Sequence, residues 1–423
     1  MVHAKELVEA LAVVTTTNTK QNGKIWQDGV TNNITFIVTK DCQLACKYCY
    51  LVGKNVNERM SWQTAKSAID YVLDNGKHFC EKSVIWDFIG GEPFLEIDLI
   101  DTICDYIKTE LYRRNHHWFE SYRFNFSTNG INYDSEKVQR FISKNREHLS
   151  IGITIDGTKR KHDLNRIWKV DGAERGSYND VVRNIPLWLE QFPTAATKVT
   201  ISTKDIPFIK ESVLHLYSLG IHEVNINVVF EDVWNKGDDN LFEDQLVDLA
   251  DAIIDGNYYK HYACSFFSEY IGKPLDSVFE NQNWCGAGKM LAVDASGNFY
   301  PCTRFAAYSL KEKRPIIIGN VKDGIDTNKI RPFLSLDRIT QSPQKCIDCN
   351  VASGCAWCQG ENYDAAETDT VFQRSTAICK MHKARVRANN YYWNKLFHKL
   401  EREGQVCEFD TLKVKSNKNA ESC

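Results

Sequence analysis

The 423-residue sequence lacks several features that would place it in whole classes of protein. No uninterrupted apolar run approaches the roughly 18–20 residues that a membrane-spanning helix needs. Basic and acidic residues nearly balance, with 52 Lys and Arg against 55 Asp and Glu. Proline is scarce, with 9 residues, and no long Gly/Ser linker, internal repeat or low-complexity segment is evident. We therefore expect a globular protein with neither a membrane nor a nucleic-acid partner.

The N-terminal apolar patch is a poor match to a secretion signal. The apolar patch from Leu7 to Val14 is interrupted by Glu9 and followed by threonines rather than by a small-residue cleavage site. We therefore expect a cytoplasmic protein, in which structural disulfides are rare. The 15 cysteines then require another explanation, and metal ligation or redox chemistry is the usual one.

The cysteines fall into groups near the two ends of the chain. Cys42, Cys46 and Cys49 form a tight first group, and the segment from Cys346 to Cys358 holds four more. Three further cysteines surround the second group: Cys285, Cys302 and Cys379. The other five stand apart: Cys80 and Cys104 are predicted to be core thiols, Cys264 lies among aromatic residues, and Cys407 and Cys423 have no visible partner.

The first half of the chain alternates β-rich runs with helical patterns. Such alternation over about 200 residues favours parallel strands joined by right-handed crossovers, in an α/β barrel. The predicted strands are 34–38, 83–89, 123–127, 150–155, 198–203 and 223–229. The predicted helices are 62–73, with Ser61 as N-cap, and 97–111, 135–143, 178–190 and 209–219. A later amphipathic helix is predicted over 385–402, followed by a polar, frayed tail over 412–423.

The first cysteine group has the spacing Cys-x3-Cys-x2-Cys and directly follows the first predicted strand. Three thiolates this close can hold three irons of a [4Fe–4S] cluster and leave the fourth iron open. Zinc is the alternative, but a zinc site usually closes with a fourth Cys or His. The nearest histidines in sequence, His3 and His78, are distant.

This triad, with Tyr48 before the last cysteine, resembles the radical S-adenosylmethionine (radical SAM) superfamily. The resemblance implies that the open iron chelates S-adenosylmethionine and that the cluster reduces it to a 5′-deoxyadenosyl radical. It assigns Tyr48 to packing on the adenine. The second strand ends in Gly90-Gly91-Glu92-Pro93, which matches the family's Gly-Gly-Glu-Pro motif. Glycines let the backbone approach the cofactor's ammonium group, and backbone carbonyls and Glu92 can accept its hydrogen bonds.

Later strand ends resemble those of peptide-modifying members of the superfamily. The resemblance concerns Ser-Thr-Asn-Gly at 127–130, Thr-Ile-Asp-Gly at 154–157 and the following His-Asp-Leu-Asn-Arg at 162–166. It implies a partial (β/α)6 TIM-like barrel whose polar strand ends hold the cofactor. The further cofactor contacts that it implies are Ser127, Thr154, Asp156, Arg166 and Ser202.

The C-terminal cysteines resemble the seven-cysteine SPASM domain, which carries two auxiliary [4Fe–4S] clusters. One residue departs from the pattern, because two residues rather than three precede the sixth cysteine. The family pattern implies that one cluster is held by Cys346, Cys349, Cys355 and Cys379, and that the other has Cys285, Cys302 and Cys358. The second cluster is then either closed by Cys264 or open to a cysteine of the substrate, and we favour the open form. A zinc ribbon at 346–358 is the alternative.

These resemblances predict three [4Fe–4S] clusters and four regions: an N-terminal extension (1–32), the barrel (33–260), the SPASM domain (261–400) and a tail (401–423). They imply a maturase of a ribosomally made, Cys-containing precursor peptide with a leader, supplied with electrons by a flavodoxin or ferredoxin. The expected product is a thioether crosslink. A carbon–carbon cyclase, an epimerase and a sulfatase-maturating enzyme are alternatives. Sulfatase-maturating enzymes carry an Asp base directly after the second SPASM cysteine, where this sequence has Thr303. A non-catalytic iron–sulfur carrier and a zinc module are alternatives of other classes.

Too few residues precede the first strand for an appended leader-binding domain at the N-terminus. We therefore expect the leader to be read by the barrel and SPASM region or by a separate partner. The predicted helix 385–402 is a candidate for part of that role, and packing on the barrel is its simpler explanation.

Overall fold

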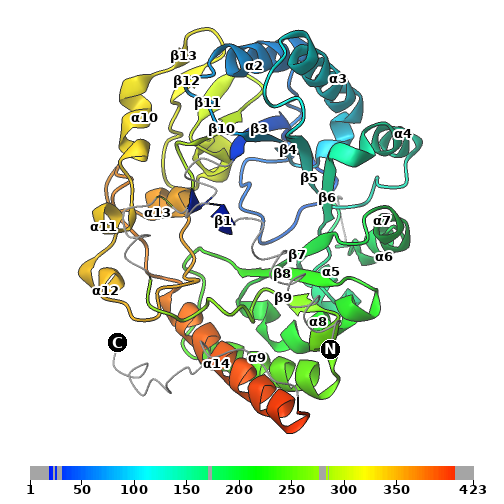
Figure 1. Ribbon diagram of the computed structural model, residues 1–423, viewed down its shortest axis with the longest axis vertical. Coiled ribbons are helices and arrows are strands. Elements are labelled where there is room, and N and C mark those ends of the chain that lie inside the picture. The colour runs from blue at the N-terminus through cyan, green and yellow to red at the C-terminus, as the bar shows by residue number, and fades with distance from the viewer. Residues whose placement is uncertain are drawn as a thin grey trace.

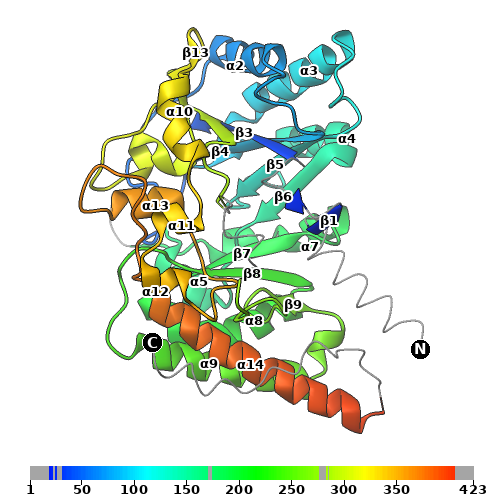
Figure 2. The same cartoon turned by 60° about the vertical axis from the view of Figure 1, so that its left-hand side comes forward.

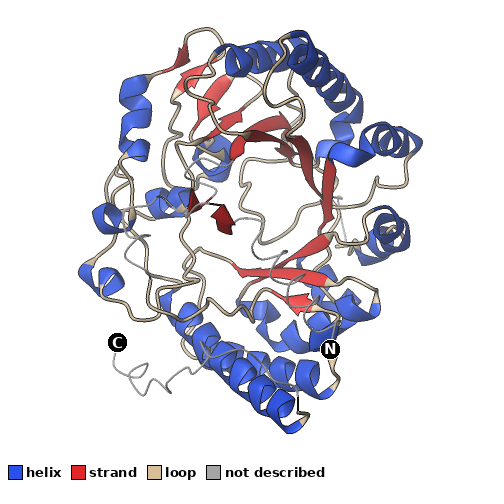
Figure 3. Ribbon diagram, viewed as in Figure 1, coloured by secondary structure: helices blue, strands red, loops and turns tan. Residues whose placement is uncertain are grey.

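The computed structural model describes residues 19–21, 24–25, 31–169, 174–275, 283 and 285–404. Its strands and helices form a ring of strands with helices outside it, as Figure 1 and Figure 3 show. The strands are β1 (Thr19–Gln21), β2 (Lys24–Ile25), β3 (Thr31–Thr39), β4 (Ser83–Gly90), β5 (Tyr122–Thr128), β6 (Leu149–Ile153), β7 (Ala196–Ile201), β8 (Glu223–Val228), β9 (Ala263–Cys264), β10 (Met290–Val293), β11 (Asn298–Tyr300), β12 (Gly319–Asn320) and β13 (Gly324–Ile325).

The α-helices lie mainly on the outside of this ring. They are α2 (Trp62–Asp74), α3 (Ile97–Arg113), α4 (Glu136–Asn145), α5 (Lys159–Asn165), α6 (Tyr178–Val182), α7 (Ile185–Gln191), α8 (Ile209–Ser218), α9 (Asp238–Asp255), α10 (Thr327–Leu334), α11 (Arg338–Gln341), α12 (Gln344–Ile347), α13 (Gln359–Asp364) and α14 (Cys379–Arg402). None of the helices in the described ranges is long and apolar enough to cross a membrane.

The predicted α/β barrel is confirmed in its main features. Strands β3, β4, β5 and β6 pair in parallel in chain order, and β7, β8 and β9 form a second parallel sheet. All six predicted strands are present within a few residues of their expected bounds. Ser61 caps α2 as expected, since its hydroxyl accepts a hydrogen bond from the Thr64 amide.

One predicted helix is wrong in its continuity. The stretch 178–190 forms two short helices, α6 and α7, rather than one. Pro186 lies in the first turn of α7. A proline there lacks the amide hydrogen that a continuous helix would need, whereas it fits the start of a new helix.

The ring of strands is interrupted between β6 and β7. A single bridge, Thr154 to Lys198, joins them in the described structure. Beside it, side chains replace the missing ladder: the Trp188 indole donates to the Ile151 carbonyl at 2.8 Å, and the Thr197 hydroxyl donates to the Ile153 carbonyl at 2.7 Å. These bonds satisfy backbone groups that would otherwise be buried without a partner.

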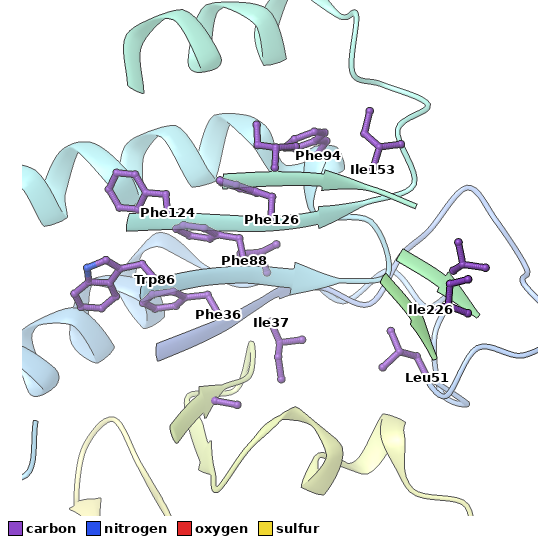
Figure 4. Close-up of a cluster of buried hydrophobic side chains, with 14 of the residues drawn as sticks. Phe36, Ile37, Leu51, Trp86, Phe88, Phe94, Phe124, Phe126, Ile153 and Ile226 are labelled. Atoms are coloured by element: carbon purple, nitrogen blue, oxygen red, sulfur yellow. The ribbon is translucent and has the colours of Figure 1, made fainter. Parts of the chain in front are cut away.

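The outer face of the first sheet packs an aromatic core against the helices. Phe36 stacks on Phe88 at 5.7 Å between ring centroids, and Phe88 stacks on Phe126 at 5.1 Å. Figure 4 shows these side chains along neighbouring strands, with Trp86 and Phe124 in the same layer. Since alternate residues point to opposite faces, the residues between them face the inside of the ring. They include the polar residues Thr35, Asp87, Asn125 and Ser127 as well as Ile37 and Ile89.

The C-terminal region extends the same sheet. Strand β10 pairs in parallel with β3, and β11, β12 and β13 continue the sheet as antiparallel strands. Helix α14 lies along α9 in both Figure 1 and Figure 2. Ion pairs join the two helices, Arg387 to Glu243 and Lys395 to Asp251. The predicted helix 385–402 is thus the larger part of α14 and packs on the barrel.

Candidate active site

The first cysteine group lies in the loop between β3 and α2. Cys42 is buried, and Cys46 and Cys49 are half-buried. The amides of Ala45 and Lys47 donate to carbonyls at the end of α5, at 2.8 and 3.0 Å, and so fix the loop. Burial raises the pKa of Cys42 to about 11, and it also raises the pKa of Cys46. Thiols in this setting become thiolates when a cationic iron cluster is present, so their chemistry fits such a cluster.

The glycines of the Gly-Gly-Glu-Pro motif bring the end of β4 against this loop. A Cβ atom on Gly90 would lie 2.1 Å from the Thr39 carbonyl oxygen. One on Gly91 would lie 2.1 Å from the Asp41 carbonyl oxygen and 2.9 Å from the Cys42 Cβ. Any larger residue at either position would therefore push the motif away from the cysteines.

Glu92 ties this motif to the next strand. Its carboxylate is buried and accepts hydrogen bonds from the Thr128 hydroxyl at 2.6 Å, the Asn129 amide at 2.7 Å and the Phe94 amide at 3.1 Å. Burial raises the pKa of Glu92, and the hydrogen bonds from these donors partly oppose the rise. Its role toward a cofactor stays a prediction, because protein donors already occupy both oxygens. Asn129, which was not among the predicted site residues, donates to the Gln43 side chain at 3.0 Å.

Three predicted cofactor contacts meet at the end of β6. The Tyr48 hydroxyl donates to Asp156 Oδ2 at 2.5 Å, and Arg166 Nη1 donates to the Tyr48 hydroxyl at 3.1 Å. Burial alone would raise the pKa of Asp156, but Lys161 and Arg166 hold it below its usual range. Arg166 Nε is buried and has no hydrogen-bond partner among the described residues. A buried donor of this kind fits a site that takes a ligand with acceptor atoms.

Lys161 is a component of this site that the sequence did not reveal. The side chain is fully buried, and its ammonium donates to the Thr200 carbonyl at 2.6 Å. It lies 3.5 Å from Asp156 and 4.0 Å from Asp205. Lys161 thereby holds the ends of β6 and β7 together across the interruption in the ring.

The remaining predicted contacts have protein partners of their own. The Ser202 hydroxyl donates to Asp205 Oδ2 at 2.6 Å and caps the short helix that follows β7. The Ser127 hydroxyl accepts from Lys198 Nζ at 2.7 Å. Thr154 forms the bridge to Lys198. All three lie at or just beyond the C-terminal ends of their strands, the position expected of a site on a parallel barrel.

The seven C-terminal cysteines of the predicted SPASM domain lie in two groups. In the first, burial raises the pKa of Cys302 well above its usual value, with the thiols of Cys285 and Cys358 adding to the effect. In the second, burial raises the pKa of Cys355 to about 11, and three neighbouring thiols add to it. Those three neighbours are Cys379, Cys346 and Cys349. The proximity of these thiols matches the partition that the family pattern implies, and their ligand roles stay predictions.

Cys264 belongs to neither group. It ends β9, and burial raises its pKa to about 12. Its thiol interacts electrostatically with Arg385 and with the hydroxyls of Tyr217 and Tyr392. Of the lone cysteines, Cys104 is buried as expected, but Cys80 is exposed, so its prediction as a core thiol is wrong. It lies in the loop before β4. Cys407 and Cys423 lie outside the described residues.

No group of three His, Cys, Asp or Glu side chains in the described ranges is arranged to hold one metal ion. A zinc ion gathers its thiolates at about 2.3 Å from a single centre. A [4Fe–4S] cluster instead takes one cysteine on each of several irons.

Arg304 joins the first cysteine loop to the C-terminal region. Its guanidinium carbon lies 4.7 Å from the centroid of the Tyr50 ring, and Tyr50 directly follows Cys49. The same guanidinium donates to Glu361 at 2.7 Å and to Glu231, beyond the end of β8, at 3.2 Å. Sequence reasoning missed this contact, because an isolated arginine near Cys302 resembles any surface charge.

Comparisons with known proteins bear on the fold and on the first cysteine group. Residues 36–228 match the family model described as the radical SAM superfamily. An uncharacterized protein of Methanocaldococcus jannaschii is 28% identical over 193 residues, which are 45% of this chain and 60% of that protein. A cysteine-type anaerobic sulfatase-maturating enzyme of Clostridium novyi is 25% identical over 370 residues, which are 80% of this chain and 91% of that enzyme.

Solved structures share the fold of most of the chain. Native anSMEcpe with bound AdoMet has a TM-score of 0.64 at 17% identity, covering 88% of this chain and 100% of that one. Streptococcus suis SuiB bound to precursor peptide SuiA has a TM-score of 0.55 at 15% identity, covering 82% of this chain and 76% of that one. A further structure of anSMEcpe holds AdoMet together with a peptide.

Proposed function

Residues 36–228 belong to the radical SAM superfamily, and from this premise we propose that the chain modifies a Cys-containing precursor peptide by forming thioether crosslinks. S-adenosylmethionine on a [4Fe–4S] cluster supplies hydrogen-atom abstraction in this superfamily. The protein residues then bind, orient and shield the reactants. The family match identifies a radical SAM domain, and the shared fold and the similarity to the Clostridium novyi enzyme support the maturase type. The peptide substrate and the C–S bond are the proposal.

The residues around the first cysteine group suit the binding of S-adenosylmethionine. Cys42, Cys46 and Cys49 would hold the cluster, and the backbone of Gly90 and Gly91 reaches the same loop. The buried Arg166 Nε, which lacks a protein partner in the described structure, offers a donor to the ligand. Tyr48, fixed between Asp156 and Arg166, presents its ring beside them.

The observation that carries the thioether proposal is the separation of Cys264 from the group of three thiols. Cys285, Cys302 and Cys358 interact with one another. The neighbours of Cys264 are Tyr217, Tyr392 and Arg385 instead. This supports an auxiliary cluster with three protein ligands, whose fourth position is available to a cysteine of the substrate. Two auxiliary clusters are part of the proposal, with Cys346, Cys349, Cys355 and Cys379 as ligands of the other.

A sulfatase-maturating activity is the second candidate. It is supported by the similarity to the Clostridium novyi enzyme along 80% of this chain. Against it stands Thr303, since a threonine hydroxyl cannot act as a base near neutral pH. A carbon–carbon cyclase or an epimerase would require the same cofactor residues.

The mass of the treated peptide and its number of alkylatable thiols distinguish these activities. The anaerobically reconstituted protein, with a chemical reductant and S-adenosylmethionine, is incubated with a synthetic peptide of repeated Cys-x-x-x units. We expect the product to lose two hydrogens for each crosslink and one alkylatable thiol with it. Loss of hydrogens with every thiol still alkylatable would indicate a carbon–carbon bond, an unchanged mass an epimerase, and a hydrazide-reactive aldehyde the sulfatase type. Each of these three results contradicts the proposal.

A further inference from the structure

A cavity of about 590 Å³ opens inside the ring of strands at the interruption between β6 and β7. Its walls come from β5, β6, β7 and the start of β8, together with the segments that lead into β6 and β7. The volume lies within the range of about 300–1,000 Å³ that is usual for ligand sites. The predicted cofactor contact Ser127 forms part of the wall, so the cavity leads from the N-terminal ends of the strands toward the cofactor region.

The strands that line the cavity expose side chains to solvent, which is unusual in a parallel sheet. Arg123 on β5, Ser150 on β6 and Lys198 on β7 are all exposed, although they lie within strands of the ring. Both faces of parallel sheets are usually covered by apolar side chains. Solvent therefore reaches the inner face of these three strands.

The charges on the cavity wall are unbalanced. Arg123, Arg146 and Lys198 are positive, and Glu147 is the single carboxylate in the wall. None of these cations has an ion pair within the described ranges; they bond to neutral oxygens, and Lys198 also interacts electrostatically with Asp87 on β4. Arg123 donates to the Leu149 carbonyl at 2.9 Å and Arg146 to the Gln191 carbonyl at 3.2 Å. An excess of positive groups in a recessed site attracts anions more strongly than the same groups on an open surface.

The cations lie at two depths. Arg123 is near the start of β5, and Lys198 bonds to Ser127, four residues further along the same strand. The Arg123 guanidinium donates to the carbonyl of Leu149, which is paired with Phe124, so at about 3.3 Å per residue the two charged groups lie about 10 Å apart along the strand. A single carboxylate or phosphate cannot reach both groups, whereas an extended peptide with acidic side chains four residues apart can.

We propose that this cavity binds an extended, acidic segment of the polypeptide substrate, with Arg123 and Lys198 as its two anchoring cations. This inference rests on the proposed peptide substrate. The segment enters from the N-terminal ends of the strands, and its inner end reaches Ser127, beside the cofactor residues. Recognition of an acidic segment by the barrel itself requires no separate leader-binding domain.

The test measures binding of a defined probe to the anaerobically reconstituted full-length protein. The probe is a fluorescein-labelled eight-residue peptide with glutamates four residues apart, and its partner carries glutamines instead. By fluorescence anisotropy we expect the glutamate probe to bind more tightly, and added salt to weaken it. In the double variant Arg123→Gln/Lys198→Gln, its affinity should fall about tenfold.

A matched control removes two cations from the outer surface. Lys137 and Arg140 on α4 are exposed and paired with Asp98 and Glu136. The double variant Lys137→Gln/Arg140→Gln should bind the probe as the unaltered protein does. Equal affinity in the cavity variant, equal binding of the two probes, or full displacement by inorganic phosphate at millimolar concentration would each overturn the proposal.

A second measurement needs no variant and so does not depend on variant folding. The same probe carrying a benzophenone is cross-linked to the unaltered protein, and the adducts are mapped by mass spectrometry. Adducts within 146–152 or 191–198 support the cavity, and adducts confined to other segments overturn it. Formation of 5′-deoxyadenosine is measured on the same preparation. Its absence would contradict the proposed function, whereas probe binding still shows whether the cavity takes an acidic peptide.

Discussion

His162 is hydrogen-bonded to the backbone of Asp156, and it is buried near positive charges that keep its ring neutral. Its Nδ1 accepts a hydrogen bond from the Asp156 amide at 3.3 Å, and its Nε2 pairs with the Ser177 hydroxyl at 3.0 Å. Burial lowers the pKa of His162 to about 3, and the charge of Arg166 adds to this effect. The ring therefore binds its proton much more readily in the unfolded chain than in the folded one.

The pH dependence of stability follows from this difference. A base whose pKa is lowered by folding contributes stability that is full above its unfolded pKa of about 6.5 and is lost as the pH falls toward 3. We expect His162 to add about 1.4 kcal/mol per pH unit to the slope of unfolding free energy in this window. Urea titrations of the apoprotein between about pH 4.5 and 7.5 measure it. A His162→Gln variant with the same slope as the unaltered protein would contradict the assignment.

Single residues of the site were predictable where they belong to a motif. The cysteines, Gly90, Gly91 and Asp156 stand out because their spacing or their position after a strand is unusual. Lys161, Lys198 and Arg304 were missed, because an isolated cation in a sequence resembles a solvated surface charge. Their burial or their contacts arise only when strands distant in sequence meet.

At the scale of elements, substitutions of Thr197 test how the interruption between β6 and β7 is stabilised. Its buried hydroxyl donates to the Ile153 carbonyl at 2.7 Å and accepts from the Ile155 amide at 3.2 Å. Thr197→Val keeps the shape but leaves both groups without a partner, so we expect a loss of about 1–3 kcal/mol in unfolding free energy. Thr197→Ser retains the hydroxyl and should lose much less. Equal stability of the two variants, measured by urea unfolding, would show that the hydroxyl has no such role.

The long elements were predictable and the short ones were not. Six strands and most helices of the barrel have apolar runs or helical spacing long enough to show a period. Strands β10 to β13 have two to four residues each, too few for any period. The interruption between β6 and β7 also leaves no trace in the sequence, because both strands carry ordinary β-rich runs.

At the scale of the whole molecule, the iron content reports on all cysteine groups together. Three [4Fe–4S] clusters predict about 12 irons per chain after anaerobic reconstitution. Replacing Cys42, Cys46 and Cys49 by alanine should remove about a third of them. Replacing Cys346, Cys349 and Cys355 should remove another third.

Cys264→Ala is the control for these cysteine replacements, because the Cys264 thiol is also buried but lies apart from both groups. It should leave the iron and sulfide content of the protein unchanged. Loss of a third of the iron would mean that Cys264 closes an auxiliary cluster, and the open position would then not exist.

The pairing of β10 with β3 has a consequence for synthesis on the ribosome. β10 emerges about 250 residues after β3, which at 5–20 residues per second is roughly 10–50 s. During that interval β3, which contains Ile34 and Phe36, is paired with β4 on one side only, and its other edge is open. Unpaired edges of this kind recruit other chains. We therefore expect truncation before residue 290 to yield aggregates, and slower synthesis at low temperature to depend on chaperones that cover β3 until β10 arrives.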